Sequence, residues 1–376
     1  MAAIEQRPPS SGRPGLWAMA CCLPLALPAV AETPPERAEV RFKTLDYRES
    51  QPGADRVAVR AATLSLRAPV NESWAVQAGQ TVDTISGASP AYHSERLTSL
   101  KDFRRAWNAG ATRYFGRGSW GVSAVHSREN DYVSRAFATQ GTWATEDKNT
   151  VWNAGWGVSS DTIRPIYGGF EDSKRVQEAL LGVTQVLSPT DIVQFNLSHS
   201  WGQGYYTDPY KLLDERPRSR HSTRLLARWN HHVDSVGATL RTSYRYSRDS
   251  WAVRAHTLAA EWVQPVSGGW TLTPSLRAHA QTNARFYLPV DPATAPNPGF
   301  PPADALYYSA DQRLSAFGAL TVGLRVDKQI HRDWTVDLKW ERYTQRTGWA
   351  WAGGLQDPGL LPFRATWVQV GLTHQF

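Results

Sequence analysis

The sequence WVQVGLTHQF, which forms residues 367–376, places Val368, Val370 and Leu372 at every second position up to the last residue. A period of two residues puts successive side chains on opposite faces of a β-strand. A terminal strand that ends on an aromatic is similar to the insertion signal of bacterial outer-membrane barrels, in which Gly371 and Phe376 are the marked positions. The alternative is an ordinary edge strand that ends in Phe by chance.

The same alternation recurs upstream, most clearly in residues 190–202, 269–282, 313–327 and 333–343. A lipid-facing strand requires about ten such residues, because one face meets hydrocarbon and the other meets water. A soluble sandwich gives the same period, with its apolar face in a core. We expect about sixteen strands: 38–48, 56–69, 72–84, 103–115, 119–128, 131–144, 149–160, 175–187, 190–202, 221–233, 235–247, 250–265, 269–282, 313–327, 333–345 and 365–376.

The connections between these strands separate barrel from sandwich. Alternate links are short, and most of the others are long, namely 85–102, 161–174, 203–220, 283–312 and 346–364. A single-chain barrel needs this arrangement, with short periplasmic turns and long extracellular loops. The prediction is therefore an all-β fold, a transmembrane antiparallel up-and-down β-barrel.

Composition agrees with this class. The 376 residues contain 17 Trp, 14 Tyr and 28 Gly but only 2 Met and 2 Cys, a profile of aromatic-rich strands with many turns. No apolar run long enough for a membrane helix occurs beyond the first thirty or so positions. The formal charge of +7 is not clustered, so we expect no nucleic-acid partner.

The N-terminus reads as a secretory signal peptide. A basic stretch ending at Arg13 precedes the apolar segment 16–27 and the small residues 29–31. Cleavage after residue 31 divides the chain into a signal peptide, 1–31, and a barrel domain, 32–376. Both cysteines leave with the signal peptide, so the mature chain has no thiol.

Polar motifs concentrate at the strand ends that we assign to the outside. Aspartates and arginines there can cross-link neighbouring loops through charge-assisted hydrogen bonds. Carboxylates that converge from several strands could instead bind Ca²⁺, although no zinc spacing or other metal motif is present. The rim residues are Asp83, Ser86, Gly87, Pro90, Asp131, Asp161, Asp208, Pro209, Asp214, Arg216, Asp249, Asp311 and Arg313.

The strands over 221–282 carry a basic set on the face assigned to the lumen, with no acid among them. A charged wall beside a low-dielectric shell attracts counter-ions into a pore. If water fills the lumen, we expect it to favour anions; alternatively, these arginines pair with acids such as Asp327, Asp337 and Glu341 and close the interior. The predicted wall consists of Arg224, Arg228, Arg241, Arg245, Arg254, Arg277 and His279.

Four strings in the rim motifs occur together: SGASP at 86–90, DPYK at 208–211, DERP at 214–217 and DQRLS at 311–315. In combination they resemble the domain-of-unknown-function 3570 (DUF3570) family of proteobacterial outer-membrane proteins, over most of the chain from Phe42. The resemblance implies an outer-membrane barrel whose gene often lies beside thioredoxin-like, small lipoprotein and flavin-transferase genes. It implies no established activity and no catalytic residues.

Two functions follow as expectations. The first is a pore for small, preferentially anionic solutes; the second is a non-conducting scaffold for a periplasmic or lipoprotein partner of a redox- or flavin-linked system. An enzyme is not expected, because the chain lacks a GxSxG nucleophile motif, a phosphate-binding glycine loop and a haem site. No cofactor is expected. The expected partners are outer-membrane lipid and the barrel-assembly machinery, which would act on the C-terminal strand.

Overall fold

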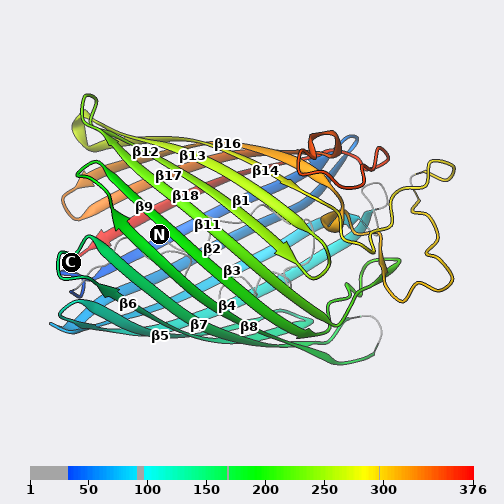
Figure 1. The fold of residues 1–376 in the computed structure, drawn as a ribbon, viewed down its shortest axis with the longest axis horizontal. Coiled ribbons are helices and arrows are strands. Elements are labelled where there is room, and N and C mark those ends of the chain that lie inside the picture. The colour runs from blue at the N-terminus through cyan, green and yellow to red at the C-terminus, as the bar shows by residue number, and fades with distance from the viewer. Residues whose placement is uncertain (1–32, 91–96, 167–168, 296) are drawn as a thin grey trace.

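The chain forms a closed barrel of sixteen antiparallel strands (Figure 1). The computed structural model describes residues 33–90, 97–166, 169–295 and 297–376, and it describes side chains outside 87–101. The predicted signal peptide, 1–31, lies outside the described residues. Within the described part, no helix is long and apolar enough to cross a bilayer.

The barrel strands confirm the sixteen predicted segments. Two further strands, β10 (Asp214–Glu215) and β15 (Tyr308–Ser309), pair with each other in the loops. The barrel strands are β1 (Glu39–Gln51), β2 (Ala54–Asn71), β3 (Trp74–Pro90), β4 (Leu97–Phe115), β5 (Gly118–Arg128), β6 (Tyr132–Ala144), β7 (Thr150–Ile163), β8 (Asp172–Val186), β9 (Asp191–Gly204), β11 (Ser219–Val233), β12 (Ala238–Asp249), β13 (Arg254–Val266), β14 (Trp270–Gln281), β16 (Phe317–His331), β17 (Trp334–Arg346) and β18 (Phe363–Gln375).

Several predicted strand boundaries are wrong by four to six residues, among them the start of β13, which was expected at residue 250 and lies at Arg254. The segment 85–102 was expected to be a loop, but β3 and β4 continue through it and pair as far as Pro90 and Leu97. The strand expected from residue 313 begins at Phe317, because Gln312–Leu314 forms a 3₁₀ turn. The carboxylate of Asp311 caps that turn by accepting a hydrogen bond from the backbone N–H of Arg313.

The barrel closes where β1 pairs with β18, from Glu39 opposite Gln375 to Ser50 opposite Arg364. Beyond this ladder, the backbone groups of Ala38 and Phe376 exchange hydrogen bonds of 3.0 and 2.9 Å. The alternation in residues 367–376 therefore forms a complete strand with a partner on each side, which removes the exposed edge of the sheet.

The short connections between strands lie at one end of the barrel and the long connections at the other, as predicted. One end of the barrel, the short-turn end, carries tight links such as 116–117 and 234–237, and the C-terminus lies there (Figure 1). The opposite, long-loop end carries the extended segments 205–218, 282–316 and 347–362. Three links at the long-loop end are short, namely 52–53, 129–131 and 250–253.

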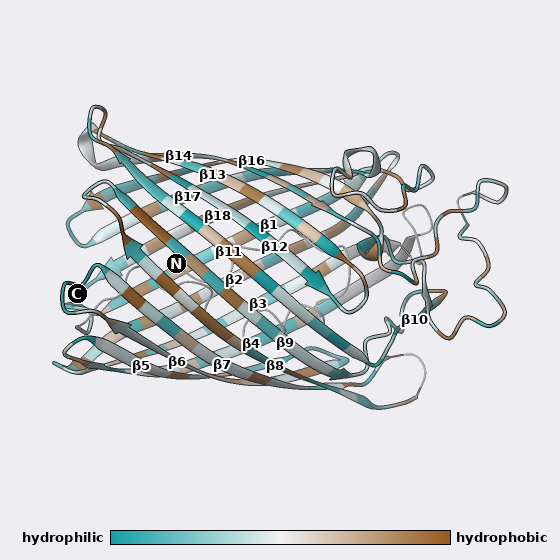
Figure 2. Ribbon diagram, in the orientation of Figure 1, coloured by the Kyte–Doolittle hydropathy of each residue, from teal (hydrophilic) through white to brown (hydrophobic). Residues whose placement is uncertain are grey.

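The outer surface of the barrel is apolar. Large hydrophobic side chains such as Leu181 and Phe195, each 54% exposed, alternate with inward polar residues, which gives the strands their banded pattern in Figure 2. Exposed aromatic residues gather near the short-turn end, as in the aromatic girdles of membrane barrels. These are Trp74, Phe115, Trp120, Trp143, Trp152, Trp229, Trp270, Trp334 and Phe376.

Candidate functional site

The register of the sheet decides which side chains enter the lumen, because residues directly opposite each other on paired strands share a face. Arg245 lies opposite Leu226 on β11 and Thr257 on β13, away from the outward Leu225 and Leu258. The same alternation places six of the predicted wall residues inside the barrel. These are Arg224, Arg228, Arg241, Arg245, Arg277 and His279.

The prediction for Arg254 is wrong. Arg254 lies opposite Arg248 and two positions from His256, on the same face as Leu258, which is 50% exposed on the outer surface. Its place at the first residue of β13 explains the error. The outer face of a strand end lies beyond the hydrocarbon layer, where charged side chains are tolerated, so polarity there does not mark the lumen side.

The inward guanidinium groups form one electrostatic cluster. Arg245 lies within range of the positive charges of Arg224, Arg228 and Arg277. Arg224 bonds to Glu178 at 3.2 Å, Arg228 donates to Gln194 at 3.5 Å and Arg277 donates to Thr321 at 3.4 Å. His279 shares a 2.8 Å hydrogen bond with Thr257. This set, without Arg254, is the lumen basic wall.

The wall is not free of acids, which corrects the prediction. Glu261 on β13 lies directly opposite Arg241, and Asp249 at the end of β12 pairs with Arg220. The arginines nonetheless outnumber the inward acids on β11–β14, so the wall keeps a basic excess.

Inward residues elsewhere differ from the wall in two ways. On the last strands, Asp327 pairs with Arg325 at 2.8 Å and Glu341 with Lys339 at 3.4 Å, so these acids pair with cations of their own strands. Small or neutral side chains line the middle of β5–β7, so this part of the lumen carries short side chains, whereas β11–β14 carry long cations. These inward residues are Ser119, Gly121, Ser123, Ala136, Ala138, Gln140, Gly155 and Gly157.

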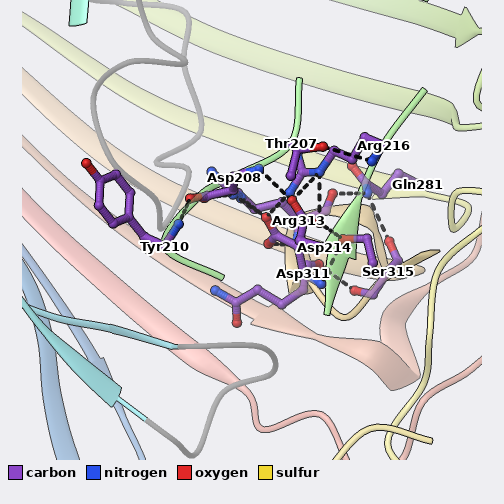
Figure 3. Close-up of polar contacts among 11 residues, drawn as sticks. Thr207, Asp208, Tyr210, Asp214, Arg216, Gln281, Asp311, Arg313 and Ser315 are labelled. Carbon is purple, nitrogen blue, oxygen red and sulfur yellow. Dashed lines mark hydrogen bonds and ion pairs between the residues drawn. The ribbon is translucent and has the colours of Figure 1, made fainter. Parts of the chain in front are cut away.

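Five predicted rim residues meet at the long-loop end, and we call this set the mouth network: Asp208, Asp214, Arg216, Asp311 and Arg313 (Figure 3). Arg313 lies between Asp208, at 2.7 Å, and Asp311, with which it forms a close ion pair. Arg216 bridges Asp214 at 2.9 Å and Asp311 at 2.8 Å. Their side chains are almost fully buried, so each charge depends on its partners.

The network determines how its acids titrate. Burial opposes ionisation of Asp311 and Asp208, but Arg313 and the neighbouring cations outweigh it and lower the pKa of both carboxyl groups. Burial dominates at Asp214 and raises its pKa despite Arg216. At Lys211, burial lowers the pKa of the ammonium group to about 8, against the attraction of Asp311.

The mouth network reaches two distant walls of the barrel. Gln312, beside Arg313, accepts a 3.4 Å hydrogen bond from the guanidinium of Arg56 on β2. On the other side, the hydroxyl of Tyr210 donates to the carboxylate of Asp131, which follows β5. Loop segments from β9–β11 and β14–β16 therefore form a continuous bonded path between the β1–β2 and β5–β6 ends.

The remaining rim residues lie in separate local pairs. Asp83, well inside β3, bonds to Arg104, and Asp161 accepts from Tyr132 at 2.6 Å with Lys174 beside it. Pro209 follows Asp208, whose carboxylate accepts from the N–H of residue 210 in an ordinary turn. Ser86, Gly87 and Pro90 belong to β3; the side chains of the last two lie outside the described residues.

Sequence reasoning missed several participants. Arg56 is 2% exposed and binds Glu49 and Gln51 as well as Gln312, and Lys211 lies beside Asp311. Arg56 belongs to none of the sequence motifs described above, so nothing in the sequence indicated its hydrogen bond to Gln312. Gln312 stands inside the DQRLS string and could have been included with its neighbours.

A family model described as "Protein of unknown function (DUF3570)" matches residues 91–372. The chain belongs to the DUF3570 family. This confirms the resemblance, although the match begins later than Phe42. No curated protein sequence matches this DUF3570 chain.

Solved structures share the barrel fold of the DUF3570 chain at low identity. A bacterial polysaccharide outer membrane secretin aligns with a TM-score of 0.52 and 10% identity over 90% of this chain and 98% of its own. CdiB from Acinetobacter baumannii aligns with a TM-score of 0.51 and 9% identity, over 89% of this chain and 60% of CdiB. The siderophore receptor PirA from Pseudomonas aeruginosa aligns with a TM-score of 0.45 and 12% identity, over 83% of this chain but only 56% of the receptor. The DUF3570 chain thus has the fold of outer-membrane β-barrels, and it spans little more than half of PirA.

Proposed function

We propose that this DUF3570 protein is an outer-membrane pore for the passive passage of small solutes, with a preference for anions. The single observation that carries the proposal is the position of Arg245 inside the barrel, surrounded by the charges of Arg224, Arg228 and Arg277. The apolar outer surface supports residence in a lipid bilayer. Sixteen strands is a size at which barrels enclose an aqueous channel.

The proposed selectivity has an electrostatic origin. A cluster of cations beside a low-dielectric wall produces a positive potential that concentrates anions and repels cations. The short side chains of β5–β7 leave that part of the lumen, two strands away from the wall, without a comparable charge. The proposed function is passage and not catalysis, since no chemical step is needed for it.

The location and assembly of the protein belong to the same proposal. Cleavage after residue 31 would release the mature chain into the periplasm, and the barrel-assembly machinery would recognise the strand that ends at Phe376. In this orientation the short-turn end faces the periplasm and the long-loop end faces outward.

Single-channel recording tests the proposal. The mature chain, 32–376, is refolded into a planar bilayer under a salt gradient, and the reversal potential reports the ratio of anion to cation permeability. The variant Arg245→Glu should lower that ratio by roughly fivefold or more, since one unit charge at about 4 Å in water contributes about 1 kcal/mol. The control is Arg254→Glu, the same charge change on the outer surface of a neighbouring strand, which should leave the ratio unchanged.

The outcomes are distinct. Loss of anion preference in Arg245→Glu alone supports the pore and its basic wall. Equal selectivity in all three proteins contradicts the proposed role of the wall. No conductance, from protein that still shows heat-modifiable barrel migration, contradicts the pore itself.

The second candidate is the non-conducting scaffold, and one observation favours it. The mouth network lies in loop segments that connect two parts of the long-loop end, from Arg56 near β1 to Asp131 after β5, so these loops extend across part of that end. A scaffold would need the loops as a rigid surface and would need no water path. Zero conductance in the wild type, retained after the network is weakened, would support the scaffold over the pore.

A further inference from the structure

Four exposed arginines lie together on the outer surface of the barrel, towards its long-loop end. Their strands are consecutive around the sheet, with β7 between the last two (Figure 1). We call this set the outer basic patch: Arg105 on β4, Arg128 on β5, Arg135 on β6 and Arg175 on β8.

The alternation on each strand shows that these arginines point outward. Each one lies an even number of positions from a large, exposed apolar residue of its own strand, so the two side chains share the lipid-facing side. These apolar residues are Trp107 on β4, Val122 on β5, Phe137 on β6 and Leu181 on β8.

The register brings the four charges close to one another. Arg105 and Arg128 are directly opposite on paired strands, where Cβ atoms are about 5 Å apart. Arg135 lies two positions beyond the partner of Arg128, a diagonal separation of about 7–8 Å. Arg135 and Arg175 are both opposite Ser160 on β7, so two strand spacings, about 10 Å, separate them.

The charge of the patch has no acid beside it. From β4 to β8, the described outward positions carry no Asp or Glu, and none of the four guanidinium groups forms an ion pair with a described residue. Arg105 lies 5.1 Å from the ring centre of Phe103, a neutral contact that leaves its charge in place.

The outer surface of β1 and β2 is different at the same end. There, Arg48 and Arg60 bond to the carboxylate of Asp46 at 2.8 and 3.4 Å. Like charges directly opposite on paired strands repel, as Arg105 and Arg128 do. An anion between them would remove that repulsion, so the patch is complementary to a negatively charged group.

The patch lies at the outer boundary of the apolar surface. Arg128 is eight positions from Trp120, and Arg135 is eight positions from Trp143, two aromatic residues near the short-turn end. Eight residues of strand span about 26 Å, or about 20 Å across the bilayer at a tilt of about 40°. The apolar band of such barrels is about 25 Å tall, and arginine side chains extend along apolar surface towards water. The guanidinium groups are therefore level with lipid headgroups.

We propose that the outer basic patch binds a lipid whose headgroup carries two or more phosphate groups, of the lipopolysaccharide class. Guanidinium groups bind phosphate oxygens in bidentate pairs. Four cations spaced over several strands can contact two phosphates of one headgroup, whereas a single phosphate would leave part of the patch unpaired. Trp107 and Phe137, beside the patch on its membrane side, would contact the acyl chains.

The proposal rests on the orientation given above, in which the long-loop end faces outward. It does not depend on conduction, because a pore and a non-conducting scaffold would present the same outer surface to lipid.

Native mass spectrometry of the refolded mature chain in detergent with a chelator tests the proposal. With a short-chain lipopolysaccharide as the probe, we expect one bound lipid per barrel. Removal of the phosphate groups from the probe should weaken binding roughly tenfold or more, because the charge-assisted hydrogen bonds are lost. Inorganic phosphate should not displace the lipid, since it lacks acyl chains; displacement would identify a site for free phosphate and overturn the proposal.

Two double variants locate the lipid on the barrel. Arg128→Gln/Arg135→Gln should weaken binding roughly tenfold or more, for the same reason. The control, Arg48→Gln/Arg60→Gln, removes two exposed arginines at the same end of the barrel that already bond to Asp46, and it should bind the lipid as the wild type does.

A stability measurement separates lost binding from misfolding. Without lipid, Arg128→Gln should melt no lower than the wild type, because it removes the repulsion with Arg105. Added lipopolysaccharide should raise the melting temperature of the wild type and the control but not of Arg128→Gln/Arg135→Gln. The proposal is overturned if the wild type binds no lipid, if the dephosphorylated lipid binds as tightly as the intact one, or if Arg128→Gln/Arg135→Gln binds as tightly as the wild type.

Discussion

Arg56 on β2 donates a hydrogen bond of 3.4 Å to Gln312, although the two residues are 256 positions apart in the chain. Both side chains are buried, and the guanidinium also bonds to Glu49 and Gln51, which lie at the end of β1. The loop between β14 and β16 is therefore attached to the far side of the closure between β1 and β18. This attachment makes the long-loop end a bonded structure and not a set of independent loops.

Gln312→Ala should release this attachment. Loss of a hydrogen bond to a charged donor costs about 1.5–3 kcal/mol, which corresponds to roughly 10- to 150-fold faster amide exchange of the loop. Hydrogen-exchange mass spectrometry should show the change in residues 308–316, with the barrel strands unaffected. Gln264→Ala, at the short-turn end, serves as the control. Unchanged exchange in 308–316 would show that the contact with Arg56 does not hold the loop.

Asp311→Asn should disrupt the mouth network itself. Asp311 accepts from both Arg216 and Arg313, and removal of one partner from a buried ion pair costs about 3–5 kcal/mol. We expect rapid proteolysis within 283–307, with heat-modifiable migration of the barrel retained. Glu171→Gln, which breaks an exposed pair with Arg164, should change proteolysis little, since solvent screens the attraction between exposed charges. Equal cleavage of both variants would contradict the role of Asp311.

Lys211 should titrate near pH 8. Burial lowers the pKa of its ammonium group to about 8, below the unfolded value. The charged form is thus disfavoured in the folded loop, so loop stability should rise between pH 8 and about 10.5, where only the folded state has lost the proton. Reductive methylation with a ¹³C label and an NMR titration measures the midpoint, and Lys211→Arg assigns the signal. A midpoint above 10 would refute the prediction.

Gly371→Ala should destabilise the barrel closure. A Cβ atom at this position would lie 2.2 Å from Oδ1 of Asp337 on the paired strand, so the neighbour must move. Overpacking of this kind costs about 1–3 kcal/mol, which urea unfolding in lipid vesicles can detect. Gly116→Ala is the control, because a Cβ there meets nothing within 4 Å. The double variant Gly371→Ala/Asp337→Ala should recover part of the loss; no recovery would point to another cause.

The strand count was predictable because apolar and polar residues alternate along most strands, and this alternation is visible in each segment of sequence taken alone. A residue that must face lipid cannot be polar over the middle of a strand, so the period of two remains visible in segments such as 190–202 and 333–343. The boundaries of β3 and β4 were not predictable, because pairing beyond the membrane layer has no apolar requirement. Arg254 was misassigned for the same reason, since both faces of a strand end tolerate charge.

The mouth network was predictable only in part. The motifs containing Asp208, Asp214 and Asp311 marked a charged rim, and the role assigned to them as loop cross-links agrees with the pairs with Arg216 and Arg313. Their connection to Arg56 was not visible, because contacts across the mouth depend on strand order and register around the whole barrel. The proximity of Asp102 on β4 to Glu129 and Asp131 after β5 was not predictable either, because it depends on the pairing of β4 with β5.

The amino-acid sequence alone predicts the fold class, the number of strands, the separation of short from long connections and the basic residues of the lumen, because alternation and turn chemistry are local properties. The closed barrel was needed to show which arginines share the lumen, which acids pair with Arg216 and Arg313, and which carboxylates of the rim lie close together. These depend on closure and register, which place residues such as Arg56 and Gln312 together at a distance that no local pattern encodes.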